Sequence, residues 1–146
     1  MHRVYRPLFG FVLAVVSASA HVVVVPATSR TGQVQRYTMH VPNEKQVVNA
    51  SVELIFPAEL TVAVVDLLPG WTLSLKKDAQ GRILSAVWAG ALAPGQAAEF
   101  TFTAQNPPQP VVVQWKAVQT FQDGSFIEWT GAEGTKTPAS KTTIGQ

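Results

Sequence analysis

Cysteine is absent from the 146 residues, which excludes disulfide scaffolds, thiolate metal sites, cysteine nucleophiles and lipid attachment at an N-terminal cysteine. Histidine occurs only three times, and the sequence contains no HExxH motif, no GxSxG motif and no glycine-rich phosphate loop before a helix. Only 14% of the residues are charged, whereas 47% are hydrophobic. This length and composition fit one domain with a hydrophobic core, and they argue against a chain that is disordered throughout.

Residues 1–20 have the parts of a secretory signal peptide. A basic start with two arginines precedes an apolar run at 8–16, and residues 18–20 (Ala-Ser-Ala) match the small-x-small pattern of a cleavage site. The apolar run is too short for a membrane-spanning helix. We therefore expect an exported, periplasmic or extracellular chain that begins at His21. An uncleaved anchor and an ordinary first strand are the alternatives.

Removal of residues 1–20 changes the charge balance. The full sequence has 11 Lys and Arg against 9 Asp and Glu, and two of the arginines lie in the predicted signal peptide. The remaining chain therefore has nine positive and nine negative side chains. A neutral domain lacks the electrostatic footprint expected of a protein that binds nucleic acid or an anionic membrane.

The rest of the sequence predicts an all-β fold. Residues 33–41 and 97–104 alternate apolar and polar side chains, and Gly- or Pro-containing turns recur every 8–12 residues. The predicted strands cover 21–25, 33–41, 48–56, 60–67, 71–76, 82–88, 97–104, 111–121 and 125–130. About nine short strands of this kind indicate an antiparallel β-sandwich. Residues 131–146 are rich in Gly, Thr, Ser and Lys, which predicts a flexible polar tail after a domain at 21–130.

Cleavage before His21 has a chemical consequence. An N-terminal histidine offers an amine and the imidazole Nδ1, which together close a six-membered chelate around a metal ion. The amine has an ordinary pKa of about 8, so a metal displaces its proton at modest cost near neutral pH. Nitrogen ligands in a planar arrangement suit Cu(II). The other amino-terminal copper motif needs histidine third in the chain, where this sequence has Val23. The alternative interpretation is an exposed histidine at a chain end.

Two nitrogens leave a copper site incomplete, and a carboxylate is the natural supplement. Glu44 follows the predicted strand 33–41 and could be presented at the strand end. A surface charge that is solvated or paired with Lys45 is the alternative. His40 lies on the polar face of its predicted strand, which favours a solvated residue over a second ligand.

Five linked segments resemble the YcnI-like copper-binding domain of exported bacterial proteins, over nearly all of residues 20–130. They are AHVVVVP at 20–26, YTMHVPNEK at 37–45, LPGW at 68–71, VWAG at 87–90 with PG at 94–95 and EF at 99–100, and KAVQTFQDG at 116–124 followed by Trp129. No single segment is specific, but their combination in this order is. The resemblance implies an immunoglobulin-like sandwich, in agreement with the strand pattern.

The resemblance also implies a site built on a single histidine. The matching positions are His21, with its amine and imidazole as ligands, and Glu44, with an oxygen. A family tryptophan near the copper falls on Trp129, as a neighbour rather than a strong ligand, because indole has no basic lone pair. An ordinary core or rim aromatic is the alternative role for Trp129.

The function that we expect from this resemblance is non-enzymatic: holding Cu(II) for delivery or sequestration. The expected partners are the copper ion and another exported copper chaperone or a membrane copper transporter, with no nucleic acid. Many relatives continue into a C-terminal membrane helix, whereas this sequence ends in polar residues, so we expect no membrane anchor. The alternatives are a copper oxygenase, which would need His40 as a second ligand, and a metal-free interaction domain.

Overall fold

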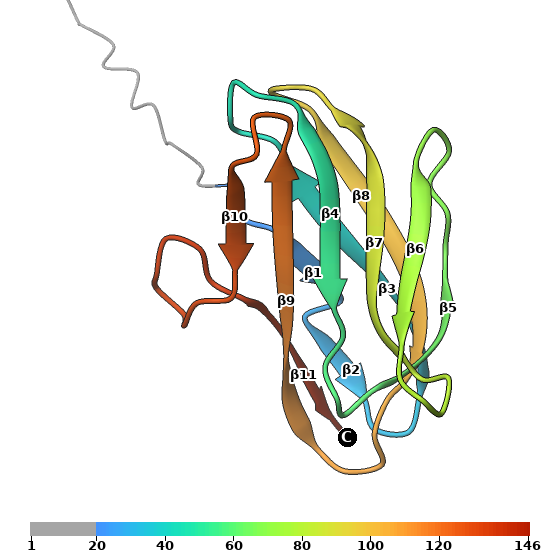
Figure 1. The fold of residues 1–146 in the computed structure, drawn as a ribbon. Helices are drawn as coiled ribbons and strands as arrows, with labels where there is room; N and C mark the ends of the chain where they lie inside the picture. Colours follow the sequence, from blue (N-terminus) through green and yellow to red (C-terminus); the bar gives the residue numbers. More distant parts are fainter. Residues whose placement is uncertain (1–19) are drawn as a thin grey trace, which may run out of the picture.

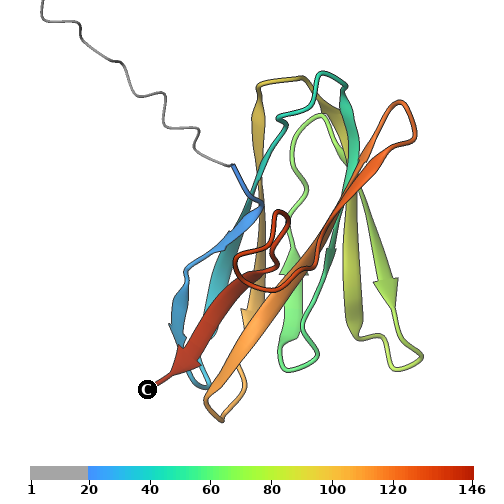
Figure 2. The same ribbon diagram turned by 90° about the vertical axis from the view of Figure 1, so that its left-hand side faces the viewer.

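Alternating apolar and polar side chains give the chain two packed β-sheets, as the sequence predicts (Figures 1 and 2). The computed structural model describes residues 20–146. The strands are β1 (Val23–Val25), β2 (Thr28–Arg30), β3 (Val34–Pro42), β4 (Asn49–Ile55), β5 (Thr61–Val65), β6 (Thr72–Lys77), β7 (Ile83–Leu92), β8 (Ala97–Gln105), β9 (Val111–Phe121), β10 (Phe126–Trp129) and β11 (Ser140–Gly145). The predicted signal peptide lies outside the described residues, except for Ala20. Residues 20–146 contain no helix with the length and apolarity that crossing a bilayer requires.

The two sheets contain four and seven strands. The smaller sheet has the order β1-β3-β8-β5, and the larger has the order β2-β11-β9-β4-β7-β6, with β10 also paired to β9. All pairs are antiparallel except β11 with β2, which is parallel. The predicted antiparallel sandwich is therefore confirmed. Residues 20–146 contain eleven strands rather than about nine, because the sequence pattern does not predict β2 and β11.

The core lies between the sheets and is rich in aromatic rings. Tyr37 on β3 and Phe102 on β8 are fully buried, and their ring centroids are 5.5 Å apart. Trp115 on β9 approaches both rings from the other sheet, at 4.9 Å and 5.3 Å. Each large buried side chain contributes about 2–3 kcal/mol through removal of apolar surface from water. These contacts fix the two sheets relative to each other.

The prediction of a flexible tail at 131–146 is wrong. Residues 140–145 form β11, which pairs with β9 and β2. Thr142 and Ile144 are buried, and the Thr142 hydroxyl accepts a hydrogen bond from Trp115 Nε1 (2.9 Å) and donates one to the Pro26 carbonyl (2.9 Å). The polar composition misled the prediction because β11 buries only every second side chain and one of its partners, β2, lies near the other end of the domain in the sequence. The folded domain therefore continues to Gly145.

The chain segment that contains His21 lies where the edges of the two sheets meet. Strand β1 is the edge of the four-stranded sheet, and its Val24 N–H donates to Ser140 Oγ of β11 in the other sheet (2.9 Å). Figure 2 shows this N-terminal segment beside the loop that precedes β11. Strand β10 ends at Trp129, opposite Ala117 of β9, and it lies on the same side of the sandwich (Figure 1). Residues from both sheets can therefore reach His21.

Candidate metal centre

His21 lies directly before β1, and its imidazole contacts Trp129 at the end of β10. The two ring centroids are 5.6 Å apart and the rings are tilted by 53°. Trp129 is only 7% exposed, so it forms a fixed aromatic wall beside the partly buried His21. The structure thus brings together two of the three residues that the sequence singled out. Trp129 belongs to the hydrophobic core as well as to this wall, as the core-aromatic alternative predicts.

Glu44 is the third residue, and it reaches the backbone next to His21. The Ala20 N–H donates a hydrogen bond to Glu44 Oε1 at 3.3 Å. The His21 nitrogen is the next nitrogen along the backbone, one peptide unit away. In the uncleaved chain that nitrogen is an amide, and cleavage after Ala20 would turn it into an amine. The Glu44 carboxylate therefore lies close to the position of a new N-terminus.

The loop that carries Glu44 is held by Asn43, which sequence analysis missed. The Asn43 side chain is buried, and its amide donates to the carbonyls of Val47 (2.8 Å) and Leu92 (2.9 Å). Its Oδ1 accepts the Lys45 N–H (3.0 Å), as in an Asx-turn. An asparagine directly after a strand and a proline is the sequence signal that could have indicated this turn. Glu44 therefore sits on a short loop that the hydrogen bonds of Asn43 hold in place.

The alternative partner for Glu44, the Lys45 ammonium, is directed elsewhere. Lys45 Nζ donates to Ser125 Oγ at 2.6 Å and lies 4.5 Å from the centre of the Phe121 ring. Phe121 is the last residue of β9, and Ser125 lies in the turn between β9 and β10. This orientation leaves the Glu44 carboxylate directed at the backbone before His21.

His40 lies on β3 opposite Val23 of β1, and its side chain points to the outer face of the sheet. Its sequence neighbours Met39 and Val41 are fully buried, so His40 points outward, with 46% of its side chain exposed. Its Nδ1 lies 3.8 Å from Glu99 Oε1 of β8. Trp129, in contrast, belongs to the core between the sheets. The structure therefore places His40 on an outer face, as expected for a solvated strand residue.

A hollow borders His21 on the side of the β10–β11 loop. Its lining residues are His21, Glu133, Gly134, Pro138, Ala139 and Lys141. Lys141 Nζ and Glu133 Oε2 are 3.3 Å apart, and the Glu133 side chain is largely exposed. The open side of the candidate centre is thus bordered by a solvent-exposed ion pair.

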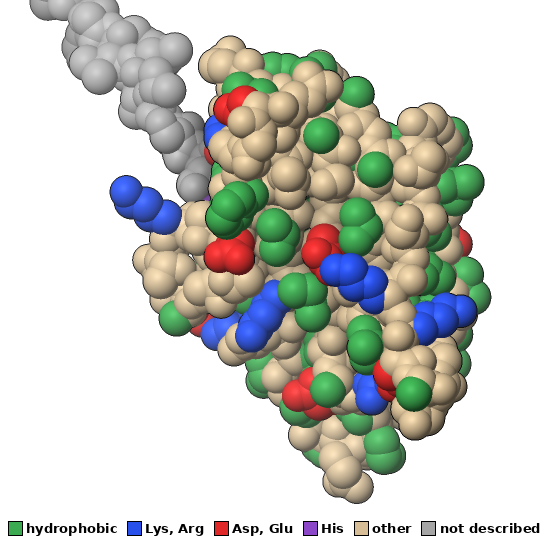
Figure 3. All heavy atoms as spheres, viewed as in Figure 1, with side chains coloured by type: hydrophobic (Ala, Val, Ile, Leu, Met, Phe, Trp, Pro, Cys, Tyr) green, Lys and Arg blue, Asp and Glu red, His purple; other side chains and the backbone are tan. Residues whose placement is uncertain are grey.

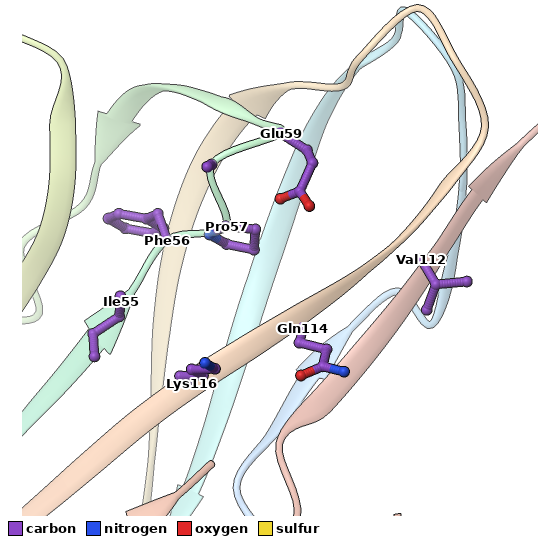
Figure 4. A pocket seen from close by; sticks show the side chains of 8 residues that line it. Ile55, Phe56, Pro57, Glu59, Val112, Gln114 and Lys116 are labelled. Carbon is purple, nitrogen blue, oxygen red and sulfur yellow. The ribbon is translucent and has the colours of Figure 1, made fainter. Parts of the chain in front are cut away.

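A second hollow lies at the end of β4 (Figure 4). Phe56, Pro57 and Glu59 line it from the chain after β4, and Gln114 and Lys116 line it from β9. Its lining residues include one carboxylate and one ammonium but no histidine. This set provides neither nitrogen ligands for a metal nor a nucleophile with an adjacent base, so the hollow is not the candidate centre.

The outer surface of the seven-stranded sheet carries charges of both signs. Figure 3 shows Lys and Arg side chains interspersed with Asp and Glu side chains and with apolar residues. Lys76 Nζ pairs with Glu53 Oε1 at 2.9 Å on this sheet. The Lys76 hydrogen bond is the main cause that lowers the pKa of Glu53, and the Ser85 hydroxyl adds to it while burial opposes both. This face does not form the continuous basic surface that binding to nucleic acid requires.

The donor set at His21 fits a metal only if a backbone nitrogen takes part. Within residues 20–146, no three His, Cys, Asp or Glu side chains form a group that could hold a metal ion. His21 offers one imidazole and Glu44 one carboxylate, and the His21 nitrogen becomes a third donor once it is a free amine. Nitrogen donors with a carboxylate suit Cu(II), which favours tetragonal N,O coordination.

The fold and this site together define an immunoglobulin-like β-sandwich with a candidate metal centre at His21. The chain belongs to the family described as "Domain of unknown function (DUF1775)", which matches residues 21–144. The matched region begins at His21 and reaches into β11. The chain is 40% identical over 130 residues to "Copper-binding protein CutI" of Bacillus subtilis (strain 168). These matches confirm the resemblance predicted from the sequence segments.

The alignment with the Bacillus protein covers 87% of this chain but 63% of that protein, so the chain spans less than two thirds of this relative. Among solved structures, an uncharacterized immunoglobulin-like protein from Nocardia farcinica superposes with a TM-score of 0.75 at 23% identity, covering 86% of this chain and 99% of that one. A cohesin module from Clostridium perfringens superposes with a TM-score of 0.54 at 10% identity, covering 87% of this chain and 100% of the module. At these identities both likenesses concern the fold, and they confirm the predicted sandwich.

Proposed function

We propose that this protein, after cleavage before His21, binds one Cu(II) ion through the His21 amine and imidazole and the Glu44 carboxylate. The observation that carries the proposal is the 3.3 Å hydrogen bond from Ala20 N–H to Glu44 Oε1, which puts the carboxylate beside the future amine. The name of the 40% identical relative, a copper-binding protein, supports copper as the metal. The role is to hold copper for delivery or sequestration.

Each residue of the proposed site contributes a different property. The His21 imidazole and amine supply neutral nitrogens in a chelate, and Glu44 supplies a negative charge that favours Cu(II) over Cu(I). Trp129 packs against the imidazole and limits its orientations. The indole is a neighbour rather than a ligand, because its nitrogen carries a hydrogen that is donated to Gln119 (2.7 Å).

The oxygenase alternative is disfavoured by the position of His40. A copper oxygenase of this type would need a second imidazole opposite the first to support both oxidation states. His40 lies on an outer sheet face beside Glu99. We therefore propose a non-enzymatic protein, and we expect no reductant-dependent cleavage of polysaccharide by the copper-loaded chain.

Export and delivery also belong to the proposal. The signal-peptide pattern at 1–20 supports an exported, periplasmic or extracellular protein. An exported copper chaperone or a membrane copper transporter is the partner class that such a carrier would serve. Intact mass of the protein recovered outside the cytoplasm tests the first step, since the proposal requires a chain that begins at His21.

The decisive test compares mature protein that begins at His21 with the same protein acetylated at the His21 amine. Acetylation keeps every side chain and converts the amine into an amide without adding a new amine, which an added residue would supply. Isothermal titration with Cu(II), with competition by a chelator, should give about one tight site for the mature protein and none of comparable affinity for the acetylated one. Equal affinities would contradict a role for the amine.

Glu44→Gln in the mature protein is the matched probe of the carboxylate. It keeps an oxygen but loses the charge, so it should weaken Cu(II) binding less than acetylation of the His21 amine does. Glu59→Gln, a change of the same type in the second hollow, is the control and should leave the affinity unchanged. An unchanged affinity in Glu44→Gln would show that Glu44 is a surface charge and not a ligand.

A further inference from the structure

Gln119 is a buried polar residue that connects two parts of the candidate centre, Trp129 and the loop that carries Glu44. It lies on β9 and is only 1% exposed. Its Oε1 accepts the Trp129 indole N–H at 2.7 Å, and its Nε2 donates to the Pro42 carbonyl at 3.0 Å and to Asn49 Oδ1 at 3.4 Å. A buried amide is costly unless it is hydrogen-bonded, and this one uses both donors and its oxygen.

The partners define which way the amide faces. The Trp129 indole nitrogen can only donate, and the Pro42 carbonyl can only accept. The oxygen must therefore face Trp129 and the nitrogen must face Pro42. The position needs one acceptor for the Trp129 N–H and two donors for the Pro42 carbonyl and Asn49 Oδ1. An ionised carboxylate or a thioether has no donor, and a hydroxyl has only one. The chemistry of the position thus requires the amide of glutamine.

The hydrogen bonds of Gln119 reach Trp129 on one side and Pro42 on the other. Trp129 packs against the His21 imidazole. Pro42 ends β3 and directly precedes the Asn43 loop that carries Glu44. Since β9 and β3 belong to different sheets, the Gln119 side chain spans the sandwich beneath the site.

We propose that Gln119 is a positioning residue for the copper site, which fixes the Trp129 ring against His21 and sets the start of the Glu44 loop. This inference rests on the proposed function, but its geometric part applies to the metal-free protein as well. Partners that orient ligands in this way typically change metal affinity by about 10–100-fold when they are removed.

The test uses mature protein that begins at His21, with the variants Gln119→Met, Trp129→Phe and the double variant. Gln119→Met keeps the side-chain length and removes all three hydrogen bonds, and Trp129→Phe keeps an aromatic ring but removes the N–H. Each single variant should lower Cu(II) affinity by about tenfold and change the copper EPR spectrum. Because both break the same bond, the double variant should lose much less than the sum of the two.

Tyr37→Phe is the matched control. It removes a buried hydrogen bond of the same 2.7 Å length, from Tyr37 Oη to Asn106 Oδ1, at the opposite end of β3 and β8 from Pro42. Its thermal stability should fall by an amount similar to that of the Gln119 variant, while its copper affinity and EPR spectrum stay those of the wild type. A general loss of stability would therefore not imitate the positioning effect.

The results separate this inference from the proposed function. Wild-type affinity and spectrum in Gln119→Met, or additive effects in the double variant, would overturn the positioning role. If Gln119→Met does not fold, Trp129→Phe breaks the same bond from the other side, and a wild-type spectrum there would overturn it too. If the wild-type protein itself binds no copper, the proposed function fails, and NMR of the metal-free protein decides the inference: the His21 ring signals should shift in Trp129→Phe and in Gln119→Met but not in Tyr37→Phe.

Discussion

Replacement of Ile144 by alanine should strongly destabilise the domain, because the C-terminal segment is a core strand. Ile144 is 1% exposed and belongs to the main hydrophobic cluster. Removal of a buried isoleucine side chain to alanine costs about 2–5 kcal/mol, through lost transfer free energy and the cavity that remains. We expect about 3 kcal/mol. For a domain of this size, that corresponds to a fall in Tm of about 10 °C.

Urea unfolding followed by tryptophan fluorescence measures this free energy, with the m-value checked for two-state behaviour. Thr143→Ala is the control, because Thr143 is the exposed neighbour on the same strand. It should cost less than about 1 kcal/mol. An Ile144→Ala variant as stable as the control would show that β11 is not docked, and the earlier expectation of a flexible tail would then be right.

Two further predictions concern other parts of the sandwich. Gly90→Ala should destabilise the protein by about 1–3 kcal/mol, because a Cβ there would overlap the Trp71 ring. Gly145→Ala is the control and should be nearly neutral, because a Cβ there meets open space. Equal unfolding free energies for the two variants would contradict this expectation. The Lys76 hydrogen bond lowers the pKa of Glu53 below its ordinary value of 4.5, so the charged form stabilises the fold above that pH and this stability is lost as the pH falls through the lowered pKa. Glu53→Gln should therefore lower Tm at pH 6 but have a smaller effect at pH 3, and an equal difference at both values would contradict this.

The period-2 patterns of the sequence were sufficient to predict the layers of the fold. Residues 33–41 were expected to alternate, and β3 does so with Tyr37, Met39 and Val41 inward. Strand β2 was missed because three residues, Thr28–Arg30, carry too little pattern. Its parallel pairing with β11 joins segments more than 110 residues apart, so only the tertiary structure could reveal it.

The candidate site was predicted less completely than the fold. His21 follows from the cleavage pattern and Glu44 from its position after the strand at 33–41, whereas the role of Trp129 depends on the family resemblance alone. Gln119 was not noticed, although the pattern of β9 contains its signal. Residues 113, 115, 117 and 121 face inward and are apolar, and Gln119 occupies the inward position between them. A polar residue at such a position needs buried partners, but the sequence could not say that Trp129 is one of them.

The most direct test of the central claim is Cu(II) binding by the mature chain with a free and with an acetylated His21 amine, measured by titration and by EPR on the same samples. We expect one tight, nitrogen-rich tetragonal site in the chain with the free amine, and its loss in the acetylated chain. Equal affinity and identical spectra for the two proteins would contradict this expectation, because the His21 amine would then not be a ligand.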